Sequence, residues 1–165
     1  MGSEDNWQWI LLIVLLIMSA FFSTSETALM SLSKIKIRSM VAKNVPKAKK
    51  VQKLVETPSN LLGAILVGNN IVNIGASALA TSIAIKEFGD AGVGIATGIM
   101  TFIVLIFGEI TPKSLAAQHS EKISLKVVNI LSFFVFILKP ITVVLMKITN
   151  AIINRPLRQA RRRWS

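Results

Sequence analysis

The chain has no cysteine and only one histidine, His119. Disulfide frameworks, structural zinc sites, iron–sulfur clusters and haem attachment need thiolates or clustered imidazoles, so these classes of site are not expected. Any metal ion bound by this chain must therefore be held by oxygen atoms. Acidic residues are also scarce, with 8 aspartates and glutamates against 19 lysines and arginines, which gives a formal net charge of +11.

The chain is unusually rich in apolar residues. Hydrophobic residues make up 52% of its 165 residues and the mean hydropathy is +0.61, which is too high for an ordinary soluble domain and indicates a one-domain membrane protein. The basic residues cluster beside the apolar runs, with eight in residues 34–53 and five in residues 155–163. Such clusters mark the cytoplasmic side and contact anionic lipid. Nucleic acid is the alternative partner, and the position beside apolar runs favours lipid.

Three apolar runs are long enough to cross a bilayer as helices, which takes about 17–25 residues. They cover about residues 10–31, 59–86 and 91–108. Residues 1–9 combine acids with tryptophans and are predicted to form an extracellular segment. Residues 34–56 alternate basic and apolar positions, which predicts short amphipathic helices on the inner membrane surface.

A last apolar run, residues 123–153, is interrupted by Lys139 and Pro140. One crossing would put the arginines of residues 155–163 outside, against the positive-inside rule. We therefore predict juxtamembrane helices over about 120–154 that form a bent hairpin or a surface-lying pair. A true fourth span with a basic outer tail is the alternative.

The predicted fold is an all-α membrane protein with three transmembrane helices, cytosolic-side amphipathic juxtamembrane helices and a C-terminal bent helical hairpin. A basic tail covers residues 161–165. The expected location is the plasma membrane, as a multi-pass protein with its N-terminus outside and its C-terminus in the cytoplasm.

The third run ends in Phe107-Gly108-Glu109-Ile110-Thr111-Pro112-Lys113. Pro112 has no N–H for the carbonyl four residues back, so it predicts a kink and a free carbonyl on Gly108 beside the carboxylate of Glu109. These oxygens would form half of a site for a hard cation. The alternative is a plain proline kink with a Glu109–Lys113 ion pair.

Polar residues interrupt all three runs at what should be a similar depth, and such residues normally face the protein interior or a water-filled cavity. They are Ser23, Ser25 and Glu26 in the first run, Gly68, Asn69, Asn70 and Asn73 in the second, and Gly108 and Glu109 in the third. Ser19, Ser23 and Glu26 share one helical face. The oxygen donors suit magnesium or calcium, and sodium is also possible. Helix-joining hydrogen bonds are the alternative, favoured for Ser23 and Asn73 taken singly; the ion site is favoured for Asn70 with Glu109.

Three segments of the chain together resemble the signatures of one family. They are Phe21-Phe22-Ser23-Thr24-Ser25-Glu26-Thr27-Ala28-Leu29, Val67-Gly68-Asn69-Asn70-Ile71-Val72-Asn73 and Gly108-Glu109-Ile110-Thr111-Pro112-Lys113. In this order, with a basic insertion after the first, they resemble the transmembrane domain of CNNM/CorC magnesium transporters over roughly residues 7–160. The resemblance implies a transmembrane domain at 10–160, a homodimer of three-span chains with a cytosolic juxtamembrane belt, and regulatory CBS domains that this chain does not contain.

The resemblance also implies a magnesium site that is supplied or shaped by Ser23, Ser25, Gly68, Asn69, Asn70, Gly108 and Glu109. Magnesium export by alternating access follows from it, with sodium as the coupling ion. Glu26 and Asn73 are candidates for a second ion or for gating, and Pro112 for a kink.

Two other functions compete with magnesium export. The first is a magnesium-sensing regulator that binds the ion and signals to cytosolic domains without transporting it. The second, an enzyme, is not expected, because His119 has no cysteine partner and the serines near Glu26 have no histidine base at a compatible spacing.

Overall fold

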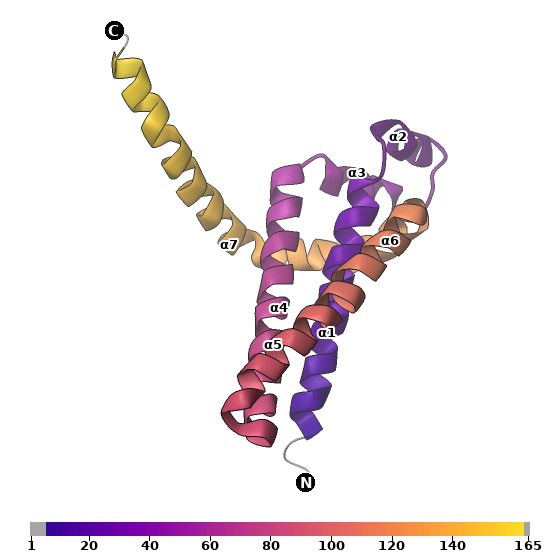
Figure 1. Ribbon diagram of the computed structural model, residues 1–165. Coiled ribbons are helices and arrows are strands. Elements are labelled where there is room, and N and C mark those ends of the chain that lie inside the picture. The colour runs from indigo at the N-terminus through magenta and orange to yellow at the C-terminus, as the bar shows by residue number, and fades with distance from the viewer. Residues whose placement is uncertain (1–5, 164–165) are drawn as a thin grey trace.

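The structure is a computed structural model that describes the backbone of residues 6–163 and the side chains of residues 6–153. Every element in this part of the chain is helical (Figure 1). The predicted extracellular acids Glu4 and Asp5 and the arginine side chains of residues 155–163 lie outside what is described. In the tail at 161–165, only the backbone of residues 161–163 is described.

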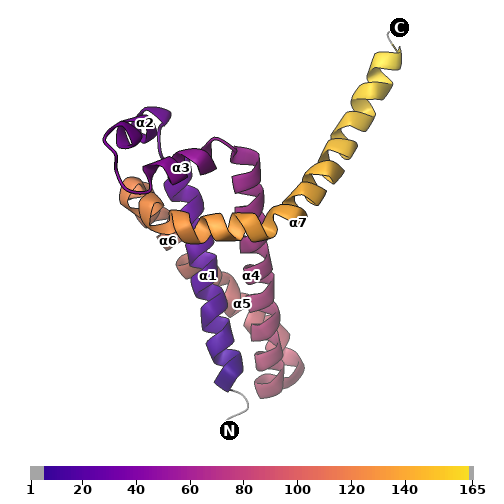
Figure 2. The same cartoon turned by 180° about the vertical axis from the view of Figure 1, so that it is seen from behind.

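Three long helical rods form the body of the molecule (Figures 1 and 2). Helix α1 (Asn6–Met30) is antiparallel to α4 (Pro58–Phe88). The chain reverses at the short 3₁₀ turn η1 (Gly89–Ala91), where Gly89 has a φ of 63°, a left-handed conformation that suits glycine. Helix α5 (Gly92–Ile103), the π-helix η2 (Val104–Ile110) and α6 (Thr111–Gln118) then run back alongside α1 as one rod.

The helices have the length and apolarity that a bilayer requires. Three continuous helical stretches qualify as spans, namely Asn6–Met30, Pro58–Gln118 and Ser120–Ile153. The second stretch holds two of the predicted spans, because it doubles back at Gly89. The prediction of an all-α membrane protein is therefore confirmed. The observed helices are longer than predicted, since α1 begins at Asn6 and the third rod continues through Pro112 to Gln118.

Small side chains let the rods approach each other. Ala76 and Ala80 of α4 are buried against Leu12 of α1 and Met100 of α5. At the start of α5, a Cβ on Gly92 would collide with the backbone carbonyl of Ala84. The small residues of α4 are thus used within the chain, where they allow close helix packing.

A belt of amphipathic helices covers the end of the bundle at which α1 and α6 finish (Figures 1 and 2). It consists of α2 (Lys34–Ala42), α3 (Ala48–Val55) and the first half of α7 (Ser120–Arg163). The buried residues of these two helices are Ile37, Met40, Ala48 and Val51, whereas their lysines and Ile35 are exposed. Two polar contacts tie the belt together, Lys36–Glu121 at 2.9 Å and Lys50 Nζ to Asn129 Oδ1 at 2.9 Å. The short amphipathic helices predicted within residues 34–56 are present, as α2 and α3.

The predicted C-terminal hairpin is wrong, because Ser120–Arg163 is one continuous helix of 44 residues. Its first half lies across α1 and α4, with Val128 and Leu131 fully buried, and the helix then bends away from the bundle (Figure 2). Pro140 accounts for the bend, since a proline removes one helical hydrogen bond and crowds the preceding turn. The apolar residues after it contain no turn-forming sequence, so the helix continues.

Candidate functional site

The middle of the bundle is organised around Ser19 of α1, which is 1% exposed. Its hydroxyl donates to Oδ1 of Asn69 on α4 at 3.4 Å. On its other side, a Cβ on Gly108 would lie 2.8 Å from Ser19 Oγ, so the third rod can approach here only because residue 108 is glycine. Ser19 therefore joins all three rods. The sequence interpretation placed it on the same face as Ser23 but left it out of the site.

Two oxygen atoms near this junction have no hydrogen-bond partner within the described part of the chain. They are the hydroxyl of Ser23, which is 1% exposed, and Oδ1 of Asn73. Each follows the Ser19–Asn69 contact by one helical turn, and because α1 and α4 are antiparallel they lie on opposite sides of it along the bundle. A buried polar atom without a partner costs about 1–3 kcal/mol. Both oxygens are therefore available to a ligand.

Ser25, although also buried, is already satisfied. Its hydroxyl donates to the backbone carbonyl of Phe21 at 2.7 Å, four residues earlier in α1. Such a bond occupies the hydroxyl within its own helix. Ser23 and Ser25 are both predicted site residues, and the structure gives them different environments.

Gly68 packs directly against an aromatic ring. A Cβ at this position would lie 2.5 Å from the ring of Phe22, which is itself 1% exposed and meets Phe134 of α7 edge-on at a centroid distance of 5.2 Å. Gly68 thus shapes the bundle by admitting Phe22, and this contact ties α1 and α4 to the belt.

The two neighbouring asparagines of α4 point in different directions. Asn69 is half-buried and contacts Ser19, whereas Asn70 is exposed. Successive residues on an α-helix differ by about 100° in direction, so only one of them can face Ser19. Among the residues with described side chains, no hydrogen bond joins Asn70 to Glu109.

Glu109 and Glu26 also differ. Glu26 pairs with Lys113 of α6 at 3.5 Å, with both side chains about 40% exposed. Glu109 is half-buried and, within residues 6–153, has no hydrogen bond or ion pair. The alternative Glu109–Lys113 pair is therefore replaced by a pair that links α1 to α6, and the carboxylate of Glu109 is left without a counter-charge.

The backbone around Glu109 is a π-helix. The N–H of Thr111 donates to the carbonyl of Ile106, five residues back. Pro112 follows at the start of α6 and is buried. Because it has no N–H, one carbonyl lacks a helical donor, that of Gly108 at the α-helical spacing or of Phe107 at the π spacing. The wide turn accommodates the proline without ending the rod.

These groups form an oxygen-rich region with little charge. Across the described residues no group of three or more histidine, cysteine or acidic side chains could hold a metal ion. A hard cation here would depend on hydroxyl, amide and backbone oxygens with Glu109 as the nearby carboxylate. Such a donor set fits an ion that keeps part of its water shell, as magnesium does, better than a permanently bound metal.

A three-rod helical bundle with the length and apolarity to cross a bilayer defines a polytopic membrane domain, and this one has unpaired oxygens near its centre. The chain belongs to the CNNM family: the model of the cyclin M transmembrane N-terminal domain matches residues 10–162. The family resemblance read from the three sequence segments is thus confirmed.

Curated relatives support the assignment. The chain is 49% identical to a UPF0053 protein of Haemophilus influenzae over 81% of its own length and 41% identical to the UPF0053 inner membrane protein YfjD of Escherichia coli over 82%. A polyamine export protein of Haemophilus influenzae is 29% identical over 79% of the chain. The chain spans about a third of the length of these relatives, 32% for the first two and 33% for the third.

Proposed function

We propose that this chain is the membrane domain of a magnesium exporter and has no enzymatic activity. The observation that carries the proposal is the pair of unpartnered oxygens, Ser23 Oγ and Asn73 Oδ1, on either side of the Ser19–Asn69 contact. Gly108 packs against Ser19, and the next residue, Glu109, is unpaired within the described range, so the bundle presents oxygen donors of the kind that magnesium prefers. Ion binding would offset the cost of leaving these groups unsatisfied.

Export proceeds by alternating access across the plasma membrane, driven by sodium. The lysine-rich belt lies on the cytoplasmic side, where it contacts anionic lipid, and α1 begins outside. Asn73 is the candidate for the second ion, because its oxygen is free. Glu26 is the candidate for gating, because its pair with Lys113 links α1 to α6.

We further propose that the chain forms a homodimer through α5. Gly94 and Gly98 are exposed and have no atom within 4 Å of an added Cβ. Their spacing of four residues places them on one face, where small residues permit a second helix to approach closely. We expect no nucleic-acid partner.

Magnesium flux from proteoliposomes tests the proposal. Glu109→Gln removes the unpaired carboxylate charge and is expected to lower both magnesium binding, measured by calorimetry, and sodium-dependent flux by at least about tenfold. Glu56→Gln, an exposed carboxylate at the end of α3, is the matched control and should leave both unchanged. Unchanged binding in a folded Glu109→Gln protein would overturn the assignment of the site.

The same proteoliposomes distinguish magnesium export from two other functions. A magnesium-sensing regulator would bind the ion and release none across the liposome membrane. Polyamine export, favoured by the name of one relative, would appear as spermidine flux that magnesium fails to inhibit. Magnesium flux that spermidine does not reduce supports the first proposal.

A further inference from the structure

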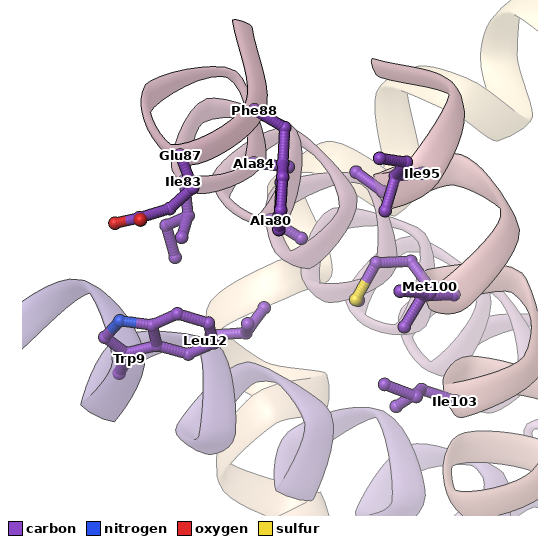
Figure 3. Close-up of a pocket in the computed structure, with 12 residues that line it drawn as sticks. Trp9, Leu12, Ala80, Ile83, Ala84, Glu87, Phe88, Ile95, Met100 and Ile103 are labelled. Atoms are coloured by element: carbon purple, nitrogen blue, oxygen red, sulfur yellow. The ribbon is translucent and has the colours of Figure 1, made fainter. Parts of the chain in front are cut away.

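An apolar groove of about 420 Å³ lies at the end of the bundle opposite the belt (Figure 3). It is bounded by the beginning of α1, the end of α4 and the length of α5. Trp9 and Leu12 form one wall, Ala80 and Ala84 the base, and Ile95 and Met100 the opposite wall, and Ala96 also lines the groove. Its volume lies within the range of about 300–1,000 Å³ that is usual for small-molecule pockets.

The lining contains a single charged side chain. Glu87, near the end of α4, lies at the rim of the groove, and all the other lining residues are apolar or aromatic. Glu87 is exposed and has no hydrogen bond or ion pair to any residue of the described range. The neighbouring Lys86 is engaged elsewhere, since its Nζ donates to Gln8 Oε1 at 3.4 Å.

The open side of the groove is apolar, so we expect lipid to cover it. Ile99 on its wall is 55% exposed and Phe88 at its rim 60% exposed. Trp9 stands at the same end, in the position typical of an interfacial tryptophan. Lys86 of α4 and Gln8 of α1 meet at this end of the bundle, so polar groups border a groove whose interior is apolar.

We propose that this groove binds one acyl chain of a phospholipid whose head group carries a primary amine, as in phosphatidylethanolamine. The acyl chain fills the space between α4 and α5, and the ammonium group donates a hydrogen bond to the carboxylate of Glu87. The exposed Asp90 of η1 adds a second negative charge at this end of the bundle. Lys86 offsets one of these two charges, and the negative charge that remains favours an amine head group and repels an anionic one such as phosphatidylglycerol. The proposal does not depend on the ion site.

Quenching of Trp9 fluorescence by brominated lipids tests this inference. The full chain with Trp7→Phe and Trp164→Phe retains Trp9 as its only tryptophan and is reconstituted in phosphatidylcholine vesicles doped with brominated phosphatidylethanolamine or phosphatidylglycerol. We expect the ethanolamine lipid to quench at an apparent affinity about two- to fivefold higher, the size of effect of one exposed charge pair. Glu87→Gln should remove most of this preference.

Three controls make the result decisive. A chain with Trp7 as its only tryptophan reports from the same end of α1 without lining the groove, so it should show no head-group preference. Asp90→Asn makes the same charge change away from the lining and should retain most of the preference. Ala96→Leu fills the groove and should weaken the quenching of Trp9 by both lipids.

Other outcomes overturn the proposal. Equal quenching of Trp9 by the two lipids, or the same pattern for Trp7, means that ordinary lipid surrounds this end of the bundle without a specific site. A Trp9 that neither lipid quenches means that a second copy of the chain covers the groove. Since Glu87 is exposed, the Glu87→Gln variant is expected to fold. If this variant keeps the full preference for the ethanolamine lipid, the proposal is also wrong.

Discussion

At the scale of the residue, the centre of the bundle separates groups whose hydrogen bonds are complete from groups whose bonds are missing. The hydroxyl of Ser25 donates to a backbone carbonyl of its own helix, and the hydroxyl of Ser19 donates to Asn69 of α4. Ser23 is as deeply buried as either and has no partner within the described residues. A helix that retains such a serine carries a destabilising group, and under the proposed function a bound cation is the partner of that group.

Ser23→Ala and Ser25→Ala therefore form a matched pair. Removing the unpaired Ser23 hydroxyl should leave thermal stability unchanged or raise the free energy of unfolding by up to about 1–3 kcal/mol, while magnesium affinity falls roughly tenfold. Ser25→Ala should keep the affinity, because that hydroxyl is already occupied. Calorimetry and thermal unfolding in detergent measure both effects. Equal losses of affinity in the two variants would remove Ser23 from the ligand set.

Gly108 gives a second prediction at this scale. An alanine there would put its Cβ 2.8 Å from Ser19 Oγ, and overpacking of this kind costs about 1–3 kcal/mol. The next nearest atom of Ser19, its Cβ, is 3.6 Å away, so Ser19→Ala should relieve the clash. A double-mutant cycle of Gly108→Ala with Ser19→Ala, measured by thermal unfolding, is expected to show the rescue. Strictly additive losses would mean that the contact does not limit packing.

At the scale of the element, the π-helix and the two prolines show how a helix can be irregular and still continue. Before Pro112 the backbone hydrogen bonds span five residues instead of four, as in a π-helix. At Pro140 helix α7 bends. Both devices leave carbonyls without helical donors. Near Pro112 the free carbonyl belongs to Gly108 or Phe107, next to Glu109 in the chain, which makes it a candidate oxygen donor for a ligand.

The pair Glu26–Lys113 connects two elements, and its role as a gate can be tested by charge exchange. Glu26→Lys places two cations opposite each other and should reduce flux several-fold through repulsion between α1 and α6. The double variant Glu26→Lys with Lys113→Glu restores the attraction and should recover most of the flux. Because both groups are about 40% exposed, we expect thermal stability to change by no more than about 1 kcal/mol. Failure of the exchange to restore flux would argue against gating by this pair.

At the scale of the whole molecule, the bundle uses its small residues in two ways. The alanines of α4 are covered by α1 and α5, whereas Gly94 and Gly98 of α5 face outward with nothing against them. Many large apolar side chains are exposed as well, as expected for a surface covered by lipid. A second copy approaching through α5 would explain why two glycines occupy a lipid-facing helix that alanine or leucine could form better.

The dimer proposal predicts that Gly94→Leu with Gly98→Leu converts the detergent-solubilised protein from dimer to monomer while its helical content is kept. Ala78→Leu on α4 adds bulk at another exposed position and should leave the dimer intact. Light scattering with detergent correction measures the mass of both variants. A dimer that survives the leucines must use a different face.

The sequence by itself determined the elements: the all-helical membrane fold, the amphipathic belt helices, the irregular stretch at Pro112 and the family. Hydropathy, periodicity and short motifs are local properties, so they can be recognised in the amino-acid sequence alone. Tertiary structure alone decided that Asn69 faces Ser19 while Asn70 does not, that Lys113 pairs with Glu26, and that residues 120–163 remain one bent helix. These depend on how each helix is rotated against its neighbours, which the packing of Phe22, Gly68 and Gly108 sets across segments far apart in the chain.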